Sequence, residues 1–375
     1  MRLLHVYSGN LFGGIEAILV TLARHRDACP ELESEFALCF DGRLARELAS
    51  AGAAVHCLGE VRVSRPHTIR RARRALAALI AARGFDAVIV HAAWSHAMFG
   101  TVARRLDVPL VLWAHDVLHG RHWTERWAKR TPPDRVVSNS NFTGASVDHA
   151  YPGVPVSVVY PPVELGGVIP TVADRAAVRR ELSTPDEAVV IAQACRMDAW
   201  KGHDVLIEAL GAIRDVRNWV CWEIGGAQRP QEAGYVTSLR DRASRLEIGD
   251  RVRFVGERSD VARLLAAADV HCQPNVTPEP FGIAFVEALA AGLPVVTSAF
   301  GGALEIVDDT CGRLVPPRDR SALAAALRSL IHDESLRRSL GAAGTRRART
   351  LCDPAAQIQR LRDALVATVG VPTIT

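Results

Sequence analysis

The sequence predicts an α/β protein made of two doubly wound domains that face each other across a cleft. The chain has 375 residues, of which 49% are apolar and 23% charged, and this is enough material for two hydrophobic cores. Short β-branched runs alternate with alanine- and leucine-rich stretches throughout, as expected of parallel sheets with helices on both faces. A segment rich in proline and glycine at 161–167 interrupts this alternation, and a second series starts after it.

The first domain is expected at residues 1–163 and the second at 164–354, each with a Rossmann-like sheet, followed by a C-terminal helix within 355–375. In the first domain strands are expected at 3–7, 36–40, 87–91, 110–114, 135–138 and 156–160. In the second they are expected at 189–193, 220–224, 252–255, 270–273, 295–297 and 313–315. Ligands of open α/β sheets bind beyond the carboxyl ends of the strands, so functional residues should follow strands directly.

Composition and charge exclude several classes of protein. A formal net charge of +4 is too small to indicate nucleic-acid binding. The eight cysteines include no C-x-x-C pair, which favours buried thiols in a reducing compartment over a disulfide framework or a zinc site. The N-terminus does not resemble a secretory signal, and no apolar run approaches the ~20 residues needed to span a bilayer. The protein is therefore expected in the cytoplasm.

A glycine-containing loop at 9–16 follows the first strand and precedes an amphipathic stretch. Gly13, Gly14 and Glu16 lie where the strand gives way to the helix, and glycines there let backbone N–H groups approach an anion. The full spacing of a dinucleotide-binding fingerprint is absent, so a plain tight turn is the alternative. The position in the first βα loop favours anion binding.

A histidine follows the strand at 110–114. His115 could donate a hydrogen bond to a sugar hydroxyl, or to charge that develops in a transition state. A structural role is the alternative, because the chain contains 13 histidines.

Two cationic residues follow the first strand of the second domain. Arg196 and Lys201 precede a helix expected at 204–213, and cations at a helix N-terminus can neutralise a diphosphate. An isolated pair would be an ordinary solvated one, but the strand, loop and helix context favours binding.

The most specific motif lies at 278–296. Glu279 is in a proline-flanked loop before a helix that begins near Gly282, and Glu287 lies on that helix among apolar residues, where a carboxylate needs a partner such as a ribose diol. Phe281, Gly282 and Ile283 would offer first-turn N–H groups to a phosphate. A helix with a capping acid and an ion-paired glutamate is the alternative.

Together these motifs resemble those of the retaining glycosyltransferases of family 4, which have the GT-B architecture, and the resemblance covers nearly the whole chain. It rests on Glu279 to Glu287, on Arg196 with Lys201-Gly202, on Gly13-Gly14 with Glu16, on His115, and on the Gly-x-Leu-Val-Pro-Pro pattern at 312–317. In similar proteins the C-terminal helix crosses back to the first domain.

The resemblance implies transfer of a sugar from a UDP- or GDP-linked donor to a glycan, lipid-linked or small-molecule acceptor with retention of configuration, as in polysaccharide biosynthesis. The implied catalytic residues are Glu279, His115, Arg196 and Lys201. The implied donor-binding residues are Gly13, Gly14, Glu16, Arg196, Lys201, Gly256, Glu257, Arg258, Glu279, Phe281, Gly282, Ile283 and Glu287. Among these, Arg196 and Lys201 would bind the diphosphate, Glu287 the ribose, and the backbone at 256–258 the base.

No cofactor or metal is expected, because no two aspartates in the chain are separated by a single residue, as a D-x-D metal clamp requires. Cationic side chains and helix N-termini would then stabilise the departing diphosphate. A nucleotide-sugar epimerase of the same architecture and a non-catalytic protein that binds sugar nucleotides are the alternative functions.

The acceptor side contains a basic segment from Arg62 to Arg83, with seven arginines, no acid, and apolar residues at helical spacing. Such a helix can lie on anionic lipid, at the inner face of the membrane. The alternative is a crossover helix whose apolar side packs on the sheet. Trp123 and Trp127 share one helical face nearby, which suits a sugar, a lipid headgroup or core packing.

Overall fold

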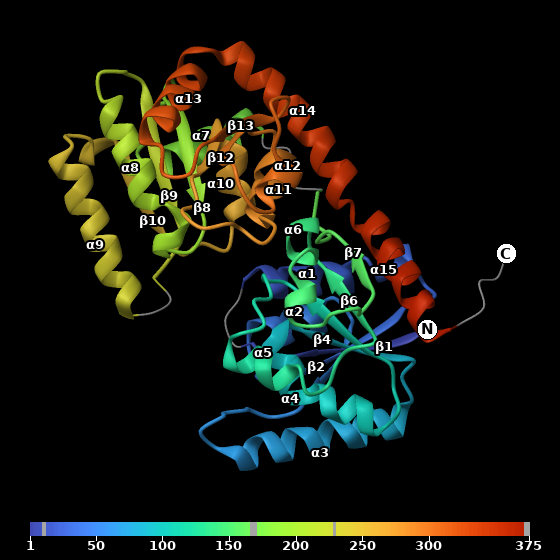
Figure 1. The fold of residues 1–375 in the computed structure, drawn as a ribbon. Helices are drawn as coiled ribbons and strands as arrows, with labels where there is room; N and C mark the ends of the chain where they lie inside the picture. The colour runs from blue at the N-terminus through green and yellow to red at the C-terminus, as the bar shows by residue number, and fades with distance from the viewer. Residues whose placement is uncertain (10–12, 166–170, 228–229, 371–375) are drawn as a thin grey trace. The chain divides into compact units, whose positions relative to one another are not determined.

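The computed structural model of the chain describes residues 1–9, 13–165, 171–227 and 230–370 and divides into two compact units (Figure 1). The N-unit consists of Met1–Val163 together with Cys352–Thr375, and the C-unit of Glu164–Leu351. The predicted boundaries lay at 163 and 354. The predicted linker at 161–167 extends beyond the described residues at 166–167.

Within the described residues, the N-unit holds a seven-stranded sheet in the order β3-β2-β1-β4-β5-β6-β7, in which every pair is parallel. β5 has the sequence LVLWA and every residue of it is buried, as expected of a central parallel strand covered on both faces. The strands are β1 (Arg2–Tyr7), β2 (Glu33–Leu38), β3 (Ala54–Cys57), β4 (Ala87–His91), β5 (Leu110–Ala114), β6 (Arg135–Ser138) and β7 (Val156–Val158).

Helices cover both faces of this sheet, with α3 and α4 on one face and α1 on the other (Figure 1). α3 begins with Pro66 in its first turn, and its buried residues, among them Leu76 and Ile80, join the core under the sheet. The helices are α1 (Gly14–Arg24), α2 (Arg43–Ser50), α3 (Pro66–Arg83), α4 (Ala92–Arg105), α5 (Trp123–Ala128), α6 (Asn141–Gly144) and α15 (Pro354–Val369), with short 3-10 helices η1 (Arg26–Ala28) and η2 (Val147–His149).

The last helix, α15, belongs to the N-unit and contacts α1, η1 and β6. The Asp353 side chain accepts a hydrogen bond from Ala356 N and so caps this helix, and Pro354 occupies its first turn. Arg362 forms an ion pair of 2.6 Å with Glu31 beside η1. The C-terminal helix therefore folds back onto the first helices of the chain.

Within the part of the chain that the structure describes, the C-unit holds a six-stranded sheet in the order β10-β9-β8-β11-β12-β13, again with every pair parallel. The strands are β8 (Val189–Ala194), β9 (Trp219–Ile224), β10 (Val252–Gly256), β11 (Val270–Gln273), β12 (Val295–Ser298) and β13 (Gly312–Val315). The helices are α7 (Val172–Glu181), α8 (His203–Ala212), α9 (Pro230–Arg245), α10 (Val261–Ala267), α11 (Ile283–Ala290), α12 (Ala303–Ile306), α13 (Arg320–His332) and α14 (Glu334–Cys352), with 3-10 helices η3 (Ala199–Lys201) and η4 (Gly249–Arg251).

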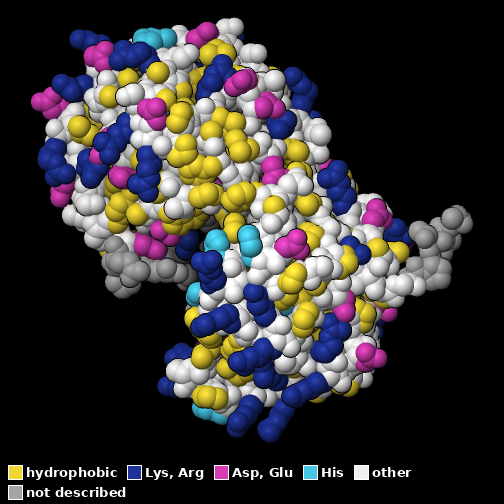
Figure 2. All heavy atoms as spheres, viewed as in Figure 1, with side chains coloured by type: hydrophobic (Ala, Val, Ile, Leu, Met, Phe, Trp, Pro, Cys, Tyr) yellow, Lys and Arg dark blue, Asp and Glu magenta, His cyan; other side chains and the backbone are white. Residues whose placement is uncertain are grey.

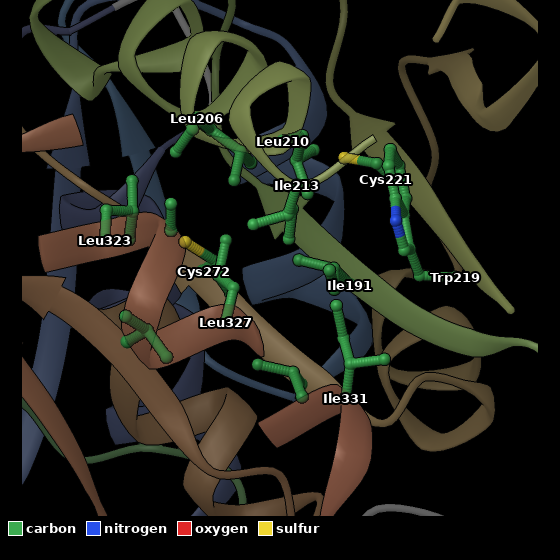
Figure 3. Close-up of a cluster of buried hydrophobic side chains, with 14 of the residues drawn as sticks. Ile191, Leu206, Leu210, Ile213, Trp219, Cys221, Cys272, Leu323, Leu327 and Ile331 are labelled. Atoms are coloured by element: carbon green, nitrogen blue, oxygen red, sulfur yellow. The ribbon is translucent and has the colours of Figure 1, made fainter. Parts of the chain in front are cut away.

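The core of the C-unit lies between its sheet and the helices α8 and α13. Figure 3 shows Leu206 and Leu210 of α8 on one side of this cluster and Leu323 and Leu327 of α13 on the other, with Ile191 of β8 beside them. All of these side chains are buried, so this contact removes a large apolar area from water and fixes α8 on the sheet.

Both sheets have the strand order of a doubly wound fold, as predicted. The order reverses between β1 and β4 in the N-unit and between β8 and β11 in the C-unit, and ligands bind at such switch points. One strand, β3, has no counterpart among the predicted strands. It has only four residues, lies at the edge of the sheet, and has no fully buried residue, so no alternation of apolar residues predicts it.

Candidate active site

The C-unit brings Lys201 and Glu279 into direct contact at the switch point between β8 and β11. Lys201 Nζ lies 2.7 Å from Glu279 Oε2, and both side chains are 13% exposed. Lys201 follows β8 and Glu279 follows β11, and these strands are neighbours. The lysine also lies over the Trp200 ring, 3.9 Å from its centroid, and this ring shields it further from water.

Two amides that sequence reasoning missed hold the Glu279 carboxylate in place. Asn275 Nδ2 donates to Glu279 Oε2 at 2.8 Å and Gln273 Nε2 donates to the same oxygen at 3.3 Å. Three nitrogen donors, those of Asn275, Gln273 and Lys201, thus meet on Oε2, whereas no hydrogen bond to Oε1 occurs among the described residues. The carboxylate is therefore oriented by one oxygen while the other remains available to a ligand.

Gly202 explains how the two loops come so close. Its φ is +76°, and a Cβ at this position would lie 1.9 Å from the carbonyl oxygen of Pro274. Val276 N also donates to Trp200 O at 2.8 Å, which joins the same two loops. Only glycine satisfies both the left-handed backbone and the close approach, so the Lys-Gly pair of the sequence motif has a packing reason.

Arg196 lies in the same loop as Lys201 and keeps more freedom. Its guanidinium is 3.5 Å from Asp198, a long contact, and its side chain is 35% exposed. The loop itself is held through the Arg196 carbonyl, which lies 3.0 Å from His203 Nε2. An exposed guanidinium on a held backbone can reach an anionic ligand without refolding the loop.

The helix α11 begins after Gly282, whose φ of +119° and close contact with Phe285 exclude a side chain. Ile283 is the first residue of this eight-residue helix; Phe285 N donates to the Gly282 carbonyl at 3.0 Å, whereas no hydrogen bond from Ile283 N or Ala284 N occurs among the described residues. Glu287 lies further along α11 among apolar neighbours. Burial raises the pKa of its carboxyl to about 7, and no ion pair of Glu287 occurs among the described residues.

The residues predicted to surround the base lie at the end of β10, an edge strand. The Arg258 guanidinium is 2.7 Å from Asp260 and 2.6 Å from Glu181, so its charge is already paired. Gly256 has a φ of +80° and accepts a hydrogen bond from Gly225 N at the end of the neighbouring strand β9. With Glu257, they form the rim of the sheet two strands away from Lys201.

In the N-unit, His115 is the last of three buried imidazoles in a row at the switch point. His115 Nε2 lies 3.0 Å from His91 Nδ1, and His91 Nε2 lies 3.0 Å from His5 Nδ1. Burial lowers the pKa of His5 and His115 to about 3 and that of His91 well below its usual value. The rings are therefore neutral, each with one N–H.

One consequence of this histidine row is a coupling of tautomers. Each hydrogen bond in the row has one hydrogen, so the three N–H groups of His5, His91 and His115 point the same way. His115 Nδ1 and His5 Nε2 are buried at the two ends without a partner among the described residues. The three rings together therefore determine whether His115 Nδ1 or His5 Nε2 carries a hydrogen.

Gly13 and Glu16, at the end of the predicted glycine loop, cap the helix α1. Gly13 N donates to Glu16 Oε2 at 2.8 Å, which caps the N-terminus of α1, and Tyr7 Oη donates to Glu16 Oε1 at 2.6 Å. Gly14 is the first residue of α1. The rest of the loop, residues 10–12, lies outside the described residues. Ligand binding by Gly13, Gly14 and Glu16 stays a prediction.

Known proteins resemble this chain over both units. Residues 12–166 match the sequence model of "Glycosyltransferase Family 4" and residues 174–347 that of "Glycosyl transferases group 1". The chain belongs to the family 4 glycosyltransferases of GT-B fold.

This glycosyltransferase is similar in sequence to enzymes named for inositol-containing substrates. It is 32% identical over 306 residues to a D-inositol 3-phosphate glycosyltransferase of Salinispora tropica, and the match covers 72% of this chain and 62% of the relative. It is 37% identical over 175 residues to a phosphatidyl-myo-inositol mannosyltransferase of Mycobacterium leprae, with 45% of this chain and 44% of the relative covered. The match therefore spans less than two thirds of these relatives.

Solved structures show the same fold. The structure of Anabaena HepE in complex with UDP and glucose has a TM-score of 0.84 and 23% identity, and 98% of this chain and 100% of that chain are covered. A glycosyltransferase from Rickettsia africae has a TM-score of 0.86 and 19% identity, with 99% of each chain covered.

In this family 4 glycosyltransferase some of the predicted site residues lie in contact and others do not. Lys201 and Glu279 meet, whereas Arg258 is engaged elsewhere. Gln273 and Asn275 were not predicted from the sequence. A signal for them was present, because polar residues at the end of an apolar strand indicate a binding or structural role. His5 and His91 were missed because a single histidine in a strand carries no signal until the strand order is known.

Proposed function

We propose that the protein transfers a sugar from a UDP- or GDP-sugar to a glycan, lipid-linked or small-molecule acceptor, with retention of configuration and without a required metal ion. The observation that carries the proposal is the anchored carboxylate of Glu279. Oε2 is held by Lys201, Asn275 and Gln273, and Oε1 is left to a ligand. This arrangement suits a sugar hydroxyl, because a carboxylate oxygen that is already oriented can accept a hydrogen bond selectively and at little entropic cost.

The donor diphosphate would be neutralised by the chain itself. Lys201 would supply a point charge, Arg196 a partly exposed guanidinium, and Ile283 and Ala284 the N–H groups at the start of α11. Charge that develops on the diphosphate as the glycosidic bond breaks would meet these groups in place, which is electrostatic catalysis. Glu287 would accept hydrogen bonds from the ribose hydroxyls.

Retention would follow from attack on the same face of the sugar from which the diphosphate leaves. The bond between the acceptor oxygen and the anomeric carbon forms, the bond from that carbon to the diphosphate oxygen breaks, and the acceptor proton passes to the leaving oxygen. His115 would face the sugar, with its tautomer set by the histidine row. No carboxylate nucleophile is needed in this scheme.

The names of the relatives suggest the first substrates to test. Two of them act on D-inositol 3-phosphate and phosphatidyl-myo-inositol, which share a phosphorylated ring, and the HepE structure contains UDP and glucose. We therefore propose an acceptor that carries a phosphate, free or linked to lipid. Exposed arginines at the start of α3, namely Arg65 just before the helix and Arg70, Arg71 and Arg74 on it, form no ion pair among the described residues and could contact an anionic headgroup.

The structure limits what kind of membrane contact can be proposed. In the described part of the chain, no helix is both long and apolar enough to pass through a membrane. The apolar residues of α3, including Ile69, Leu76 and Ile80, are buried in the N-unit core, as in the crossover-helix alternative. Figure 2 shows Lys and Arg side chains gathered over the N-unit around α3. Contact would thus be electrostatic and peripheral.

Donor binding is tested first, by thermal unfolding of the full chain with UDP-, GDP- and ADP-sugars. A sugar nucleotide that binds the folded protein raises the melting temperature. Lys201→Ala should abolish this shift, and Lys129→Ala, a change at the only other lysine in the chain, should leave it unchanged. If no sugar nucleotide stabilises the wild-type protein, the proposed donor site is wrong.

Transfer is tested next, with inositol phosphates and phosphatidylinositol as acceptors. Glu279→Ala and Lys201→Ala should each lower the rate by about 10²- to 10³-fold, the typical loss when one stabilising group is removed. The rate should not change when EDTA is added, and NMR of the product should show the anomeric configuration of the donor. An inverted product would contradict retention, and rescue by added Mg²⁺ after EDTA would contradict metal independence.

A further inference from the structure

Cys195 differs from the other cysteines in what surrounds its sulfur. The chain has eight cysteines, all within the described ranges; Cys195 is half-buried, Cys57 is exposed, and the rest are buried. Two nitrogen atoms approach Cys195 Sγ, Gln193 Nε2 at 3.4 Å and His203 Nε2 at 3.6 Å. Cys195 directly precedes Arg196, at the end of β8 where the loop toward Lys201 begins.

Both of these nitrogens are donors. His203 Nε2 also lies 3.0 Å from the Arg196 carbonyl, and Gln193 Nε2 lies 2.9 Å from the Lys201 carbonyl. A carbonyl oxygen can only accept, so each nitrogen carries hydrogen toward this loop. Gln193 Nε2 has a second hydrogen for the sulfur, whereas His203 Nε2 shares its single hydrogen between the Arg196 carbonyl and the sulfur. Donors around a sulfur stabilise its thiolate, which is the nucleophilic form.

A buried carboxylate completes the cluster. His203 Nδ1 lies 2.7 Å from Glu223 Oε2, and neither side chain is exposed. Burial alone would lower the pKa of His203, but the Cys195 sulfur and the Glu223 carboxylate raise it well above its usual value. The imidazole is therefore held as a cation next to the sulfur, in the order Cys195, His203, Glu223.

We propose that Cys195 is a modification site, a reactive thiol that forms mixed disulfides with low-molecular-weight disulfides and so weakens donor binding. The effect on donor binding rests on the proposed function, whereas the reactivity does not. The thiolate of Cys195 attacks one sulfur of the small disulfide, a new S–S bond forms, and the old S–S bond breaks. The leaving thiolate takes the electron pair and a proton from water, so the cysteine is oxidised and the other sulfur reduced.

An adduct at Cys195 would disturb the donor loop for a steric reason. A Cβ on Gly225 would lie 1.9 Å from the Cys195 carbonyl, which shows how tightly the backbone is packed there. The Gln193 amide that contacts the sulfur also holds the Lys201 carbonyl. A bulky group on the sulfur must displace these contacts, and the loop that carries Arg196 and Lys201 moves with them.

Cys57 provides an internal control. It follows His56, whose Nε2 lies 2.7 Å from Glu35 Oε2, a pair with the same separation as that of His203 and Glu223. No hydrogen bond to the Cys57 sulfur occurs among the described residues, although this thiol is the more exposed one. If exposure alone set the reactivity, Cys57 would react faster.

The full chain is incubated with oxidised glutathione at pH 6, and mass spectrometry of peptides follows each cysteine. Cys195 should react about tenfold faster than Cys57, because cysteines beside a histidine cation and hydrogen-bond donors are more reactive than cysteines without such partners. Glu223→Gln, which removes the charge partner of His203, should slow Cys195 toward the rate of Cys57. Glu35→Gln, the matched change in the N-unit, should not. An equal or faster reaction at Cys57 would overturn the proposal.

Gln193→Leu removes the second hydrogen-bond donor and replaces Glu223→Gln as the test if that variant does not fold. Unchanged reactivity of Cys195 in the folded Gln193→Leu variant would also overturn the proposal.

The effect of the adduct on donor binding is measured separately, as the affinity for UDP before and after the adduct forms. The dissociation constant should rise by about tenfold or more, and in Cys195→Ala it should not respond to glutathione. An unchanged affinity of the adduct would refute the coupling. If the unmodified protein binds neither UDP nor GDP, the proposed function fails, while the ratio of rates still decides the reactivity.

Discussion

Burial raises the pKa of the Glu287 carboxyl to about 7, so its charge changes close to neutral pH. The charged form is the better acceptor for ribose hydroxyls, and we therefore expect the affinity for UDP to fall as the pH drops from 8 to 6. Glu287→Gln should bind UDP weakly at both pH values, without this dependence. Calorimetric titration at several pH values measures both proteins.

The same carboxyl affects stability with the opposite sign. Its pKa in the folded state lies above the ordinary value of 4.5, so its contribution to folding is present below about pH 4.5 and is lost as the pH rises through about 7. Relative to the wild type, Glu287→Gln should be more stable at pH 8 than at pH 5. Urea unfolding of both proteins at the two pH values checks this, and a difference that grows toward low pH would contradict it.

The histidine row makes a prediction about residues that touch no substrate. His91→Phe keeps an aromatic ring against Trp113 but removes both hydrogen bonds that tie His5 to His115. We expect kcat to fall by about tenfold or more with little change in the KM for the donor, as for other residues that orient a functional histidine. Nitrogen NMR shifts of His115 should show altered tautomers, a readout that a purely structural role would not move.

Helix α3 combines a buried apolar face with arginines that face solvent. Because that apolar face is already packed in the N-unit core, only charge remains for binding a membrane. Arg70→Gln with Arg74→Gln should weaken binding to vesicles of phosphatidylglycerol by roughly 30-fold, since each basic residue near an anionic surface contributes about 1 kcal/mol. Co-sedimentation at low and high salt measures this.

A matched control lies on α14, where Arg346 and Arg349 are exposed in the C-unit. Changing these two arginines to glutamine removes the same charge, so it separates a local effect of α3 from one of net charge. Equal losses in both double variants, or binding that 0.5 M salt does not weaken, would contradict a role for α3.

For the molecule as a whole, the division into two units predicts two separable losses of stability. Leu365 of α15 is fully buried in the N-unit, and Leu327 of α13 is fully buried in the C-unit. Leu365→Ala should destabilise the N-unit by about 2–5 kcal/mol, and Leu327→Ala the C-unit by a similar amount. Hydrogen exchange read by mass spectrometry should show faster exchange in one sheet or the other. Equal effects on both sheets would mean that the units unfold together.

Much of the fold was predictable because both sheets are buried. β5 is a continuous apolar run and β9 is apolar apart from Glu223, and such runs between helical stretches indicate a parallel sheet. β3 was not predictable, because a short and partly exposed edge strand lacks that pattern. The fold-back of α15 came from the resemblance alone, since no local signal says which strands a terminal helix will cover.

The site divides in the same way. Lys201 and Glu279 could be found because each follows a strand in a recognisable motif, and position relative to a strand is local information. That their charged groups lie 2.7 Å apart, that Asn275 and Gln273 bind the same carboxylate oxygen, and that three histidines from distant segments form a row depends on strand order. Local sequence thus specifies the elements and the residues at their ends. The packing of strands far apart in the chain specifies contacts, burial and protonation, because those arise only when separate segments share one sheet.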